Sequence, residues 1–318
     1  MIYPWQQKQW QHMQLQLQNH KLPHALLLAG PEGLGKRAFA EAFAAYLLCD
    51  NRQETACGVC RHCQLFNAHT HPDWLELSPA AEGKIIKVEQ IRELVAELAQ
   101  TAQQASYQVI MINPAEAMNS AAANALLKNL EEPQGLVVFL LISHQPSAIP
   151  ATILSRCQRI NFTAPDIALS RSWLQQQLPP HQNAEVLLKL AENMPLRALS
   201  FAENGWVAVY DKILQQLMQL SLGVGDPLFL AANCQDEDFA RIYSIMWTVL
   251  FDLICAKSMR HGQSANELTK ISDRTTFSAL FTLLDKLMEM KKLLENKINL
   301  NMQLAYEKLF IEWSQIFN

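Results

Sequence analysis

The chain has 318 residues, of which half are apolar and 18% charged, and its formal net charge is −4 with a pI of about 6.1. This length suits two or three domains, and the composition is typical of a folded protein. No apolar run reaches the roughly 18 residues of a membrane span. The start of the chain lacks the basic and apolar regions of a secretion signal. We therefore expect a cytoplasmic protein without a membrane partner. A protein that held nucleic acid alone would usually be basic, so a nucleic-acid role is expected only in a small patch or together with partners.

The first 164 residues alternate between strand-like apolar runs and helical patterns. The expected strands cover residues 24–30, 74–77, 108–112, 136–143 and 158–162. The expected helices cover residues 5–19, 36–48, 88–103 and 121–132, with a helix or turn ending near residue 69. This alternation favours an α/β domain with a parallel sheet.

From Pro165 onward the sequence shows helical patterns and no convincing strand. Residues 166–204 form a small predicted helical unit, and a longer bundle follows. Its predicted helices cover residues 207–220, 239–258, 275–295 and 300–317, with a loop at residues 223–227. We therefore predict three domains, at residues 1–164, 165–205 and 206–318. Three tryptophans fall in these helical patterns and are expected in the core: Trp206, Trp247 and Trp313.

Residues 30–37 match the phosphate-binding pattern G-x-x-x-x-G-K. The match lies between a predicted strand and a predicted helix, which is the context that this motif requires. Gly30, Gly33 and Gly35 allow backbone N–H groups to turn toward a phosphate, and Lys36 adds a full positive charge. The weaker alternative is a glycine turn that only caps a helix.

Parts that ATP hydrolysis needs are missing from this loop. A working P-loop ATPase holds Mg²⁺ with a Ser or Thr after the lysine, but this chain has Arg37. An acidic residue should follow the next central strand, where the chain has Asn113 and Pro114, and Glu116 is not an obvious substitute. The sequence therefore predicts no ATP hydrolysis by this chain alone. Binding of ATP or ADP remains open because Lys36 and its loop are present.

Four cysteines lie close together in the sequence, at Cys49, Cys57, Cys60 and Cys63. Their spacing, ending in C-x₂-C-x₂-C, suits tetrahedral coordination of zinc by four thiolates, which leaves no open position and makes the site structural. An iron–sulfur cluster or free thiols are the alternatives. The nearby histidines are predicted not to bind the metal: His62, His69 and His71. The isolated cysteines are predicted to be packed core residues: Cys157, Cys234 and Cys255.

Together these motifs resemble the delta-prime family of bacterial DNA polymerase III, AAA+ proteins of the sliding-clamp loader. The resemblance also rests on the segments at residues 24–27, 87–92, 124–133 and 155–157. The related gamma/tau subunits share several of these segments. They keep a threonine after the lysine and acidic residues after the central strand, so the delta-prime family fits better.

The resemblance implies an AAA+ base with an inserted zinc module at residues 49–63, a helical lid and a collar that joins five subunits in a ring. It implies that Arg156 reaches ATP on a neighbouring gamma/tau subunit as an arginine finger, and that Arg197 is the lid arginine beside the nucleotide. The alternatives are an Arg156 paired with a carboxylate beside a strand and an Arg197 that is only a surface residue. The last predicted helix, at residues 300–317, packs either on neighbouring subunits or within the chain.

The expected function is that of a non-hydrolysing stator, a non-catalytic part of the DNA polymerase III holoenzyme that helps load the clamp. Its expected partners are the gamma/tau and delta subunits, the beta clamp, and primed DNA through the complex. Two alternatives are an active AAA+ ATPase, of the gamma/tau type or another DNA-dependent remodeller, and a zinc-dependent interaction module with the P-loop as scaffold. Three charged residues could form a catalytic trio but are expected to be a solvated helix face: Lys128, Glu131 and Glu132.

Overall fold

The computed structural model describes residues 1–81, 84–100, 107–133, 135–235, 237–258, 267–295 and 301–317. The chain divides into two compact units. Unit 1 contains Met1–Trp173 and Met194–Arg197, and unit 2 contains Leu174–Asn193 and Ala198–Asn318. The finer division at residues 164 and 205 stays a prediction.

Unit 1 contains a parallel sheet with the strand order β2-β3-β4-β1-β5. The strands are β1 (Ala25–Ala29), β2 (Trp74–Leu77), β3 (Gln108–Ile112), β4 (Val137–Ser143) and β5 (Gln158–Asn161). All five predicted strands are confirmed. The central strands β1, β3 and β4 are buried at every position. Strands of a parallel sheet that is covered on both faces are apolar throughout, which explains why they are continuous apolar runs in the sequence.

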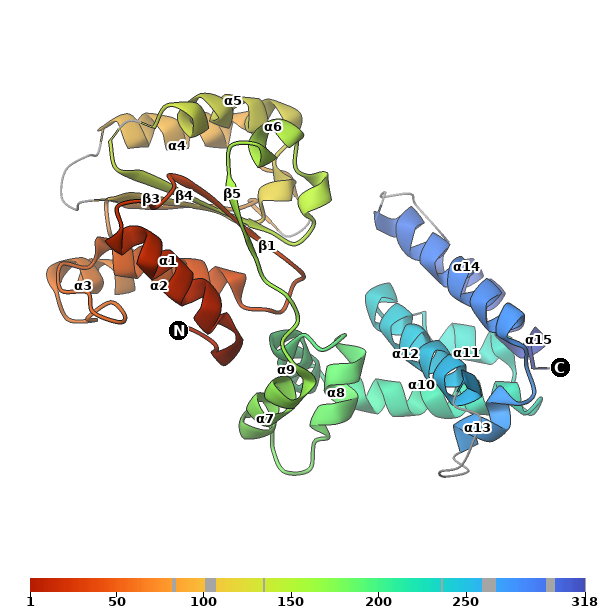
Figure 1. The fold of residues 1–318 in the computed structure, drawn as a ribbon. Coiled ribbons are helices and arrows are strands. Elements are labelled where there is room, and N and C mark those ends of the chain that lie inside the picture. The colour runs from red at the N-terminus through yellow and green to blue at the C-terminus, as the bar shows by residue number, and fades with distance from the viewer. Residues whose placement is uncertain are drawn as a thin grey trace. The chain divides into compact units, whose positions relative to one another are not determined.

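Helices cover both faces of this sheet (Figure 1). One face carries α1 (Gln7–Gln18) and α2 (Lys36–Leu48), and the other carries α4 (Val88–Gln100) and α5 (Ser120–Glu131). The predicted helices at these places are confirmed, although residues 101–103 of the third lie outside the described part of the chain. Shorter elements complete unit 1: η1 (Pro4–Gln6), α3 (Arg61–Asn67), η2 (Ala115–Ala117), η3 (Pro146–Ala148) and α6 (Ala151–Leu154).

The core of unit 1 lies in two layers, one on each face of the sheet. Successive side chains of a strand point to opposite faces, so Leu26 and Leu28 of β1 join the apolar cluster that includes Phe39 of α2. Leu27 joins the cluster on the other face, which includes Leu126 of α5. The edge of the sheet between these layers, at the carboxyl ends of β1, β3 and β4, carries the phosphate loop.

The remainder of the chain is helical, and the described residues after Asn161 contain no strand. The helices are α7 (Ile167–Gln177), α8 (Ala184–Leu190), α9 (Pro195–Glu203), α10 (Trp206–Ser221), α11 (Pro227–Asn233), α12 (Phe239–Ser258), α13 (Glu267–Ser272), α14 (Phe277–Glu295) and α15 (Met302–Gln315). The helices α11 and α13 were not predicted. The first of them follows the predicted loop, where Asp226 caps it by accepting a hydrogen bond from the backbone N–H of Leu228.

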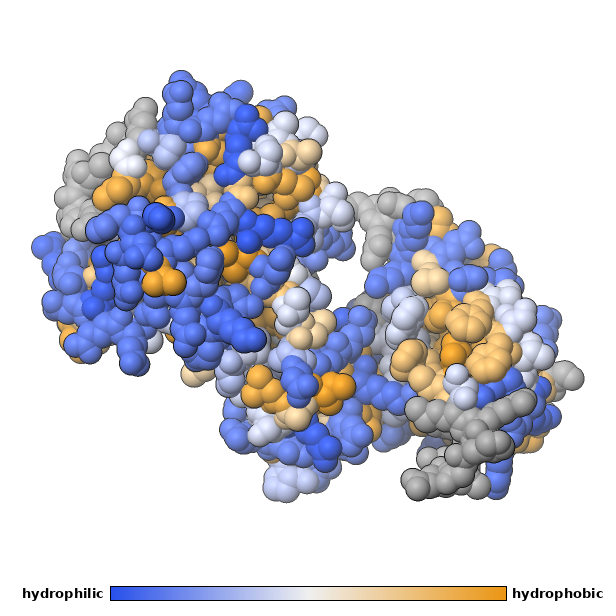
Figure 2. All heavy atoms as spheres, viewed as in Figure 1, coloured by the Kyte–Doolittle hydropathy of each residue, from blue (hydrophilic) through white to orange (hydrophobic). Residues whose placement is uncertain are grey.

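The last helix, α15, packs within the chain. Its Trp313 is buried and donates from Nε1 to the carbonyl oxygen of Leu217 at 3.1 Å and to Oγ of Ser221 at 2.9 Å. Trp206 is buried as predicted, whereas Trp247 is only half-buried. Some apolar side chains of these helices remain exposed, among them Leu304, and Figure 2 shows apolar residues on the surface of the C-terminal helices.

Candidate functional site

The phosphate loop connects β1 to α2, and its backbone requires glycine. Gly35 caps α2 with a φ of 77°, in the left-handed region that favours glycine. A Cβ atom at this position would lie 2.6 Å from the ring of Tyr3. The loop therefore has the form that the motif predicts, and it lies directly against the N-terminal segment.

That N-terminal contact was not predicted. Trp5 donates from Nε1 to the carbonyl oxygen of Leu34 at 3.0 Å. The buried Gln6 donates from Nε2 to the carbonyl oxygens of Leu34 and Gly35, at 2.9 and 3.0 Å. The ring of Trp173 meets the rings of both Tyr3 and Trp5 edge-on. Local patterns gave no signal for these bonds, because they join residues almost 30 positions apart.

The ammonium group of Lys36 is buried and fully hydrogen-bonded. Its Nζ donates to the carbonyl oxygens of Gly30 and Pro31, each at 2.6 Å, and to Nδ1 of His144 at 3.0 Å. Burial lowers the pKa of Lys36 to about 8, and the negative charge of Glu116 partly opposes this effect. Burial, followed by the positive charge of Lys36, lowers the pKa of His144. His144 therefore stays neutral and accepts the bond from Lys36.

The positions that hold Mg²⁺ in working P-loop enzymes are occupied differently here. The guanidinium of Arg37 forms ion pairs with Glu41 and with Glu76 of β2, both at 2.8 Å. Asn113 follows β3 and carries no charge. Glu116 accepts at Oε1 from the backbone N–H groups of the two residues that follow β4, His144 and Gln145, at 2.8 and 3.2 Å. The carboxylate of Glu116 thus holds the end of β4 beside Lys36.

Arg197 lies beside the loop, at the start of α9. A Cβ atom on Gly33 would lie 2.7 Å from Cβ of Arg197, and the backbone N–H of Leu196 donates to the carbonyl oxygen of Gly33 at 3.1 Å. The structure thus brings together the predicted nucleotide-site residues Gly30, Gly33, Gly35, Lys36 and Arg197.

Arg156 lies on another part of unit 1, between α6 and β5. Its Nε donates to Oε1 of Glu131 at 2.8 Å, and its Nη2 also bonds to Glu131. The residues Lys128, Glu131 and Glu132 are all exposed, which agrees with the predicted solvated helix face. Pairing of Arg156 with a carboxylate was one of the two arrangements expected from the sequence, and the structure identifies the carboxylate as that of Glu131.

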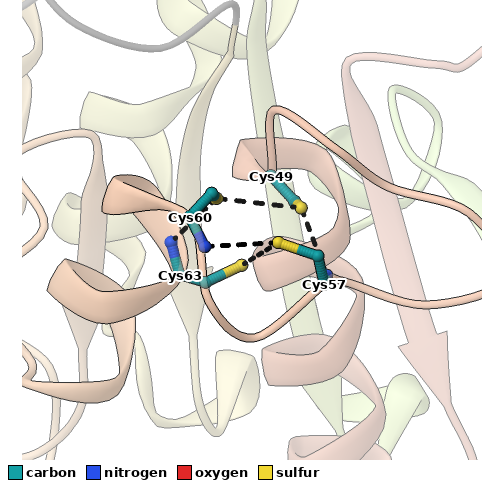
Figure 3. Close-up of side chains that lie close together, drawn as sticks. All are labelled: Cys49, Cys57, Cys60 and Cys63. Atoms are coloured by element: carbon teal, nitrogen blue, oxygen red, sulfur yellow. Dashed lines mark hydrogen bonds between the residues drawn. The ribbon is translucent and has the colours of Figure 1, made fainter.

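The four clustered cysteines converge on one point (Figure 3). One Sγ atom from each of Cys49, Cys57, Cys60 and Cys63 lies within 4.8 Å of all the others. The Sγ atoms of Cys57 and Cys63 are 3.9 Å apart, as are those of Cys49 and Cys60. Four thiolates about 2.3 Å from a tetrahedral ion would be about 3.8 Å apart. This donor set can therefore hold a metal ion.

Backbone N–H groups also point at these sulfur atoms. Cys57 donates to Sγ of Cys49 at 3.3 Å, and Cys60 donates to Sγ of Cys57 at 3.3 Å. The N–H groups of Val59 and Cys60 lower the pKa of Cys57 to about 6, which favours the thiolate that a metal requires. His62 and His71 lie outside the sulfur group and are hydrogen-bonded to each other at 2.9 Å.

The loop that carries these cysteines is fastened to α1. Trp10 and Gln14 both donate to the carbonyl oxygen of Glu54, at 3.1 and 2.9 Å. Of the isolated cysteines, Cys234 is buried, as predicted, but Cys157 and Cys255 are only half-buried. Burial raises the pKa of Cys157 to about 11, so its side chain stays a neutral thiol.

The sheet order, the phosphate loop and the helical C-terminal half define an AAA+ P-loop protein. Two family models match the chain, described as DNA polymerase III, delta subunit (residues 5–166) and DNA polymerase III, delta subunit, C terminal (residues 204–315). The chain is 38% identical to the DNA polymerase III subunit delta' of Pseudomonas aeruginosa, over 99% of this chain and 98% of that protein. It is 32% identical to the Escherichia coli subunit delta', over 82% and 77% of the two chains. The chain therefore belongs to the delta-prime family of DNA polymerase III clamp-loader subunits.

A second kind of relative is more distant. The Escherichia coli DNA polymerase III subunit tau is 30% identical over 65% of this chain and 33% of its own length. This pattern places the chain among the subunits of a clamp-loader complex. In the described part of the chain, none of the helices is both long and apolar enough to cross a bilayer.

Proposed function

We propose that this subunit takes part in clamp loading without hydrolysing ATP. This proposal rests on the residues found at the positions where working P-loop enzymes bind Mg²⁺. Arg37 replaces the hydroxyl side chain, and Asn113 and Pro114 replace the acidic side chains after β3. Without these groups the loop cannot hold Mg²⁺ against a γ-phosphate or orient an attacking water.

The contacts of Lys36 support the same conclusion. Its ammonium group is hydrogen-bonded to Gly30, Pro31 and His144, so phosphate binding would have to replace these three bonds. The side chains of Trp5 and Gln6 donate hydrogen bonds to a backbone carbonyl group of the same loop. The glycine backbone and Arg197 would suit binding of ATP or ADP without hydrolysis.

The second part of the proposal assigns Arg156 as an arginine finger for a neighbouring gamma/tau subunit. The support is its family position in Ser155-Arg156-Cys157 and its accessibility, since a third of its side chain is exposed. A guanidinium that reaches the γ-phosphate from another subunit stabilises the charge of the transition state. Supplying it in trans couples hydrolysis to correct assembly.

The third part concerns the cysteines, which would hold a structural zinc ion. The sulfur spacing fits tetrahedral coordination, and four protein ligands leave no position for substrate. A bound zinc ion would cross-link the loop after α2 to α3 and stabilise that part of the fold.

The remaining parts concern domains and partners. By the resemblance to the family, residues 165–205 would form the lid and residues 206–318 the collar; the proposed collar lies wholly within the helical unit 2. The expected partners are the gamma/tau and delta subunits, the beta clamp, and primed DNA through the complex.

ATP turnover by the purified chain tests the first part. We expect no turnover above background with ATP and Mg²⁺. Robust turnover that disappears in Lys36→Ala would instead identify an active ATPase of the gamma/tau type or another remodeller.

The finger is tested in a complex reconstituted with gamma/tau and delta subunits. Arg156→Ala should lower DNA-dependent ATPase activity while the complex still assembles. Unchanged activity would refute the finger and favour a zinc-dependent interaction module.

The metal is tested by elemental analysis of protein purified without chelator. We expect one equivalent of zinc, and Cys60→Ser should lose it. Iron or an absence of metal would refute the zinc assignment.

A further inference from the structure

The environment of Arg156 shows how its guanidinium is oriented. Its Nε and Nη2 both bond to Oε1 of Glu131, and its Nη1 donates to the carbonyl oxygen of Thr152 at 2.9 Å and to Oγ of Ser155 at 3.3 Å. All three nitrogen atoms are therefore held. One N–H of Nη2 remains without an acceptor among the described residues and is available to an incoming group.

The backbone under Arg156 is also fixed. Leu154, two residues before Arg156, and Cys157, directly after it, pack against the apolar cluster between the sheet and α5. Glu131 is the last residue of α5, and Thr152 belongs to the short helix α6. The carbonyl groups at the end of a helix carry partial negative charge, so the end of α5 favours a cation beside it.

We propose that Glu131 is a positioning residue for Arg156, an inference that rests on the proposed finger. A free arginine side chain samples many rotamers and loses this freedom when it binds phosphate. Glu131 removes much of that freedom in advance, so the guanidinium meets the neighbouring phosphate already oriented.

The strength of the pair suits this role. The side chain of Glu131 is 48% exposed and that of Arg156 is 33% exposed, and an ion pair this accessible to water is weak. It restricts the rotamers of the arginine, yet it is weak enough for the guanidinium to turn toward a more highly charged phosphate. A deeply buried pair would hold the finger back.

The test uses the reconstituted complex and measures kcat and KM for ATP. Glu131→Ala should lower kcat about three- to tenfold, the range given by one newly mobile side chain, with little change in KM. Glu131→Gln should stay within about twofold of wild type, because its amide oxygen still accepts from Arg156. The matched control is Glu132→Ala, which removes a negative charge from the adjacent residue but leaves the ion pair of Arg156 with Glu131 intact.

A double variant distinguishes the positioning role of Glu131 from the finger role of Arg156. If Glu131 acts through Arg156, then adding Glu131→Ala to Arg156→Ala should cause no further loss of kcat. If Arg156→Ala lowers activity but Glu131→Ala does not, or if Glu132→Ala has the same effect as Glu131→Ala, the positioning role is refuted and the finger stands. If Arg156→Ala has no effect, the finger itself is refuted. Thermal unfolding of each variant checks that the loss does not come from misfolding.

Discussion

At the scale of single residues, Lys36 combines a catalytic motif with structural bonding. In an active P-loop this lysine contacts phosphates, whereas here its ammonium joins Gly30 and Pro31 at one end of the loop to His144 after β4. The lysine therefore ties β1 to β4 at the edge of the sheet. Such a role gives a reason for a lysine at this position that does not depend on hydrolysis.

Replacing this lysine should destabilise the fold. In Lys36→Met the carbonyl groups of Gly30 and Pro31 lose their buried donor, so the free energy of unfolding should fall by about 1–3 kcal/mol. Urea denaturation measures the change. Lys8→Met, at an exposed position of α1, is the control and should be close to neutral. Equal effects of the two changes would contradict the structural role.

The lowered pKa of Lys36 predicts a pH dependence. The folded pKa is about 8 and the ordinary value is 10.5, so between these values the unfolded chain binds more protons than the folded chain. Burial of the charged ammonium lowers the free energy of unfolding, and this cost is fully present below pH 8. As pH increases from 8 toward 10.5 the cost disappears, so the free energy of unfolding rises. The difference in unfolding free energy between wild type and Lys36→Met should grow over this window. If this difference between wild type and Lys36→Met becomes smaller from pH 8 to 10.5, the folded state favours the charged form of Lys36 and the prediction is wrong.

At the scale of elements, the N-terminal segment connects the two chemical features of unit 1. Trp5 and Gln6 of η1 bond to the phosphate loop, and Trp10 and Gln14 of α1 bond to the loop that carries the cysteines. A helix is stiff over this length, so α1 fixes one loop relative to the other. The glutamine-rich sequence of α1 serves this purpose, because the long amide side chains reach backbone carbonyl groups.

Two glutamines of α1 allow a matched test of this connection. Gln14→Ala removes the bond to Glu54, whereas Gln11→Ala changes an exposed position of the same helix. Both changes alter helix propensity equally, so their difference reports the bond, with an expected loss of about 0.5–1 kcal/mol for Gln14→Ala. Hydrogen exchange should also speed up in residues 49–57 of this variant. The same exchange rates in both variants would show that α1 does not hold the loop.

At the scale of the whole molecule, each unit has its own core and the net charge is −4. Affinity for a DNA backbone comes mainly from neutralising phosphates with Lys and Arg. A chain with more acidic than basic residues gains little from this effect. Its contribution to DNA binding is therefore expected through the complex.

This argument predicts weak DNA binding by the isolated chain. Fluorescence anisotropy with a primed-template oligonucleotide at physiological salt should give a Kd weaker than about 1 µM, as for non-specific binding. The reconstituted complex with ATP should bind the same DNA more tightly. Tight binding by the isolated chain would show that a local basic patch outweighs its net charge.

The sequence by itself determined the strand and helix pattern of unit 1, the phosphate loop, the four cysteines and the family. These features depend on local periodicity and on short motifs with fixed spacing, so each pattern or motif lies within a short stretch of sequence. The short helices α11 and α13 were not predicted, because helices of seven and six residues show too little periodicity in the sequence.

Tertiary structure alone decided which groups meet. It brought Gln6 to Gly35, His144 to Lys36 and Glu131 to Arg156, across separations of 25 to 108 residues. Such contacts depend on the order of strands in the sheet and on the direction of each side chain, and neither leaves a local pattern. A motif can therefore predict a loop and its lysine, whereas the distant partner of that lysine, His144, is brought to it only when β1 and β4 lie side by side.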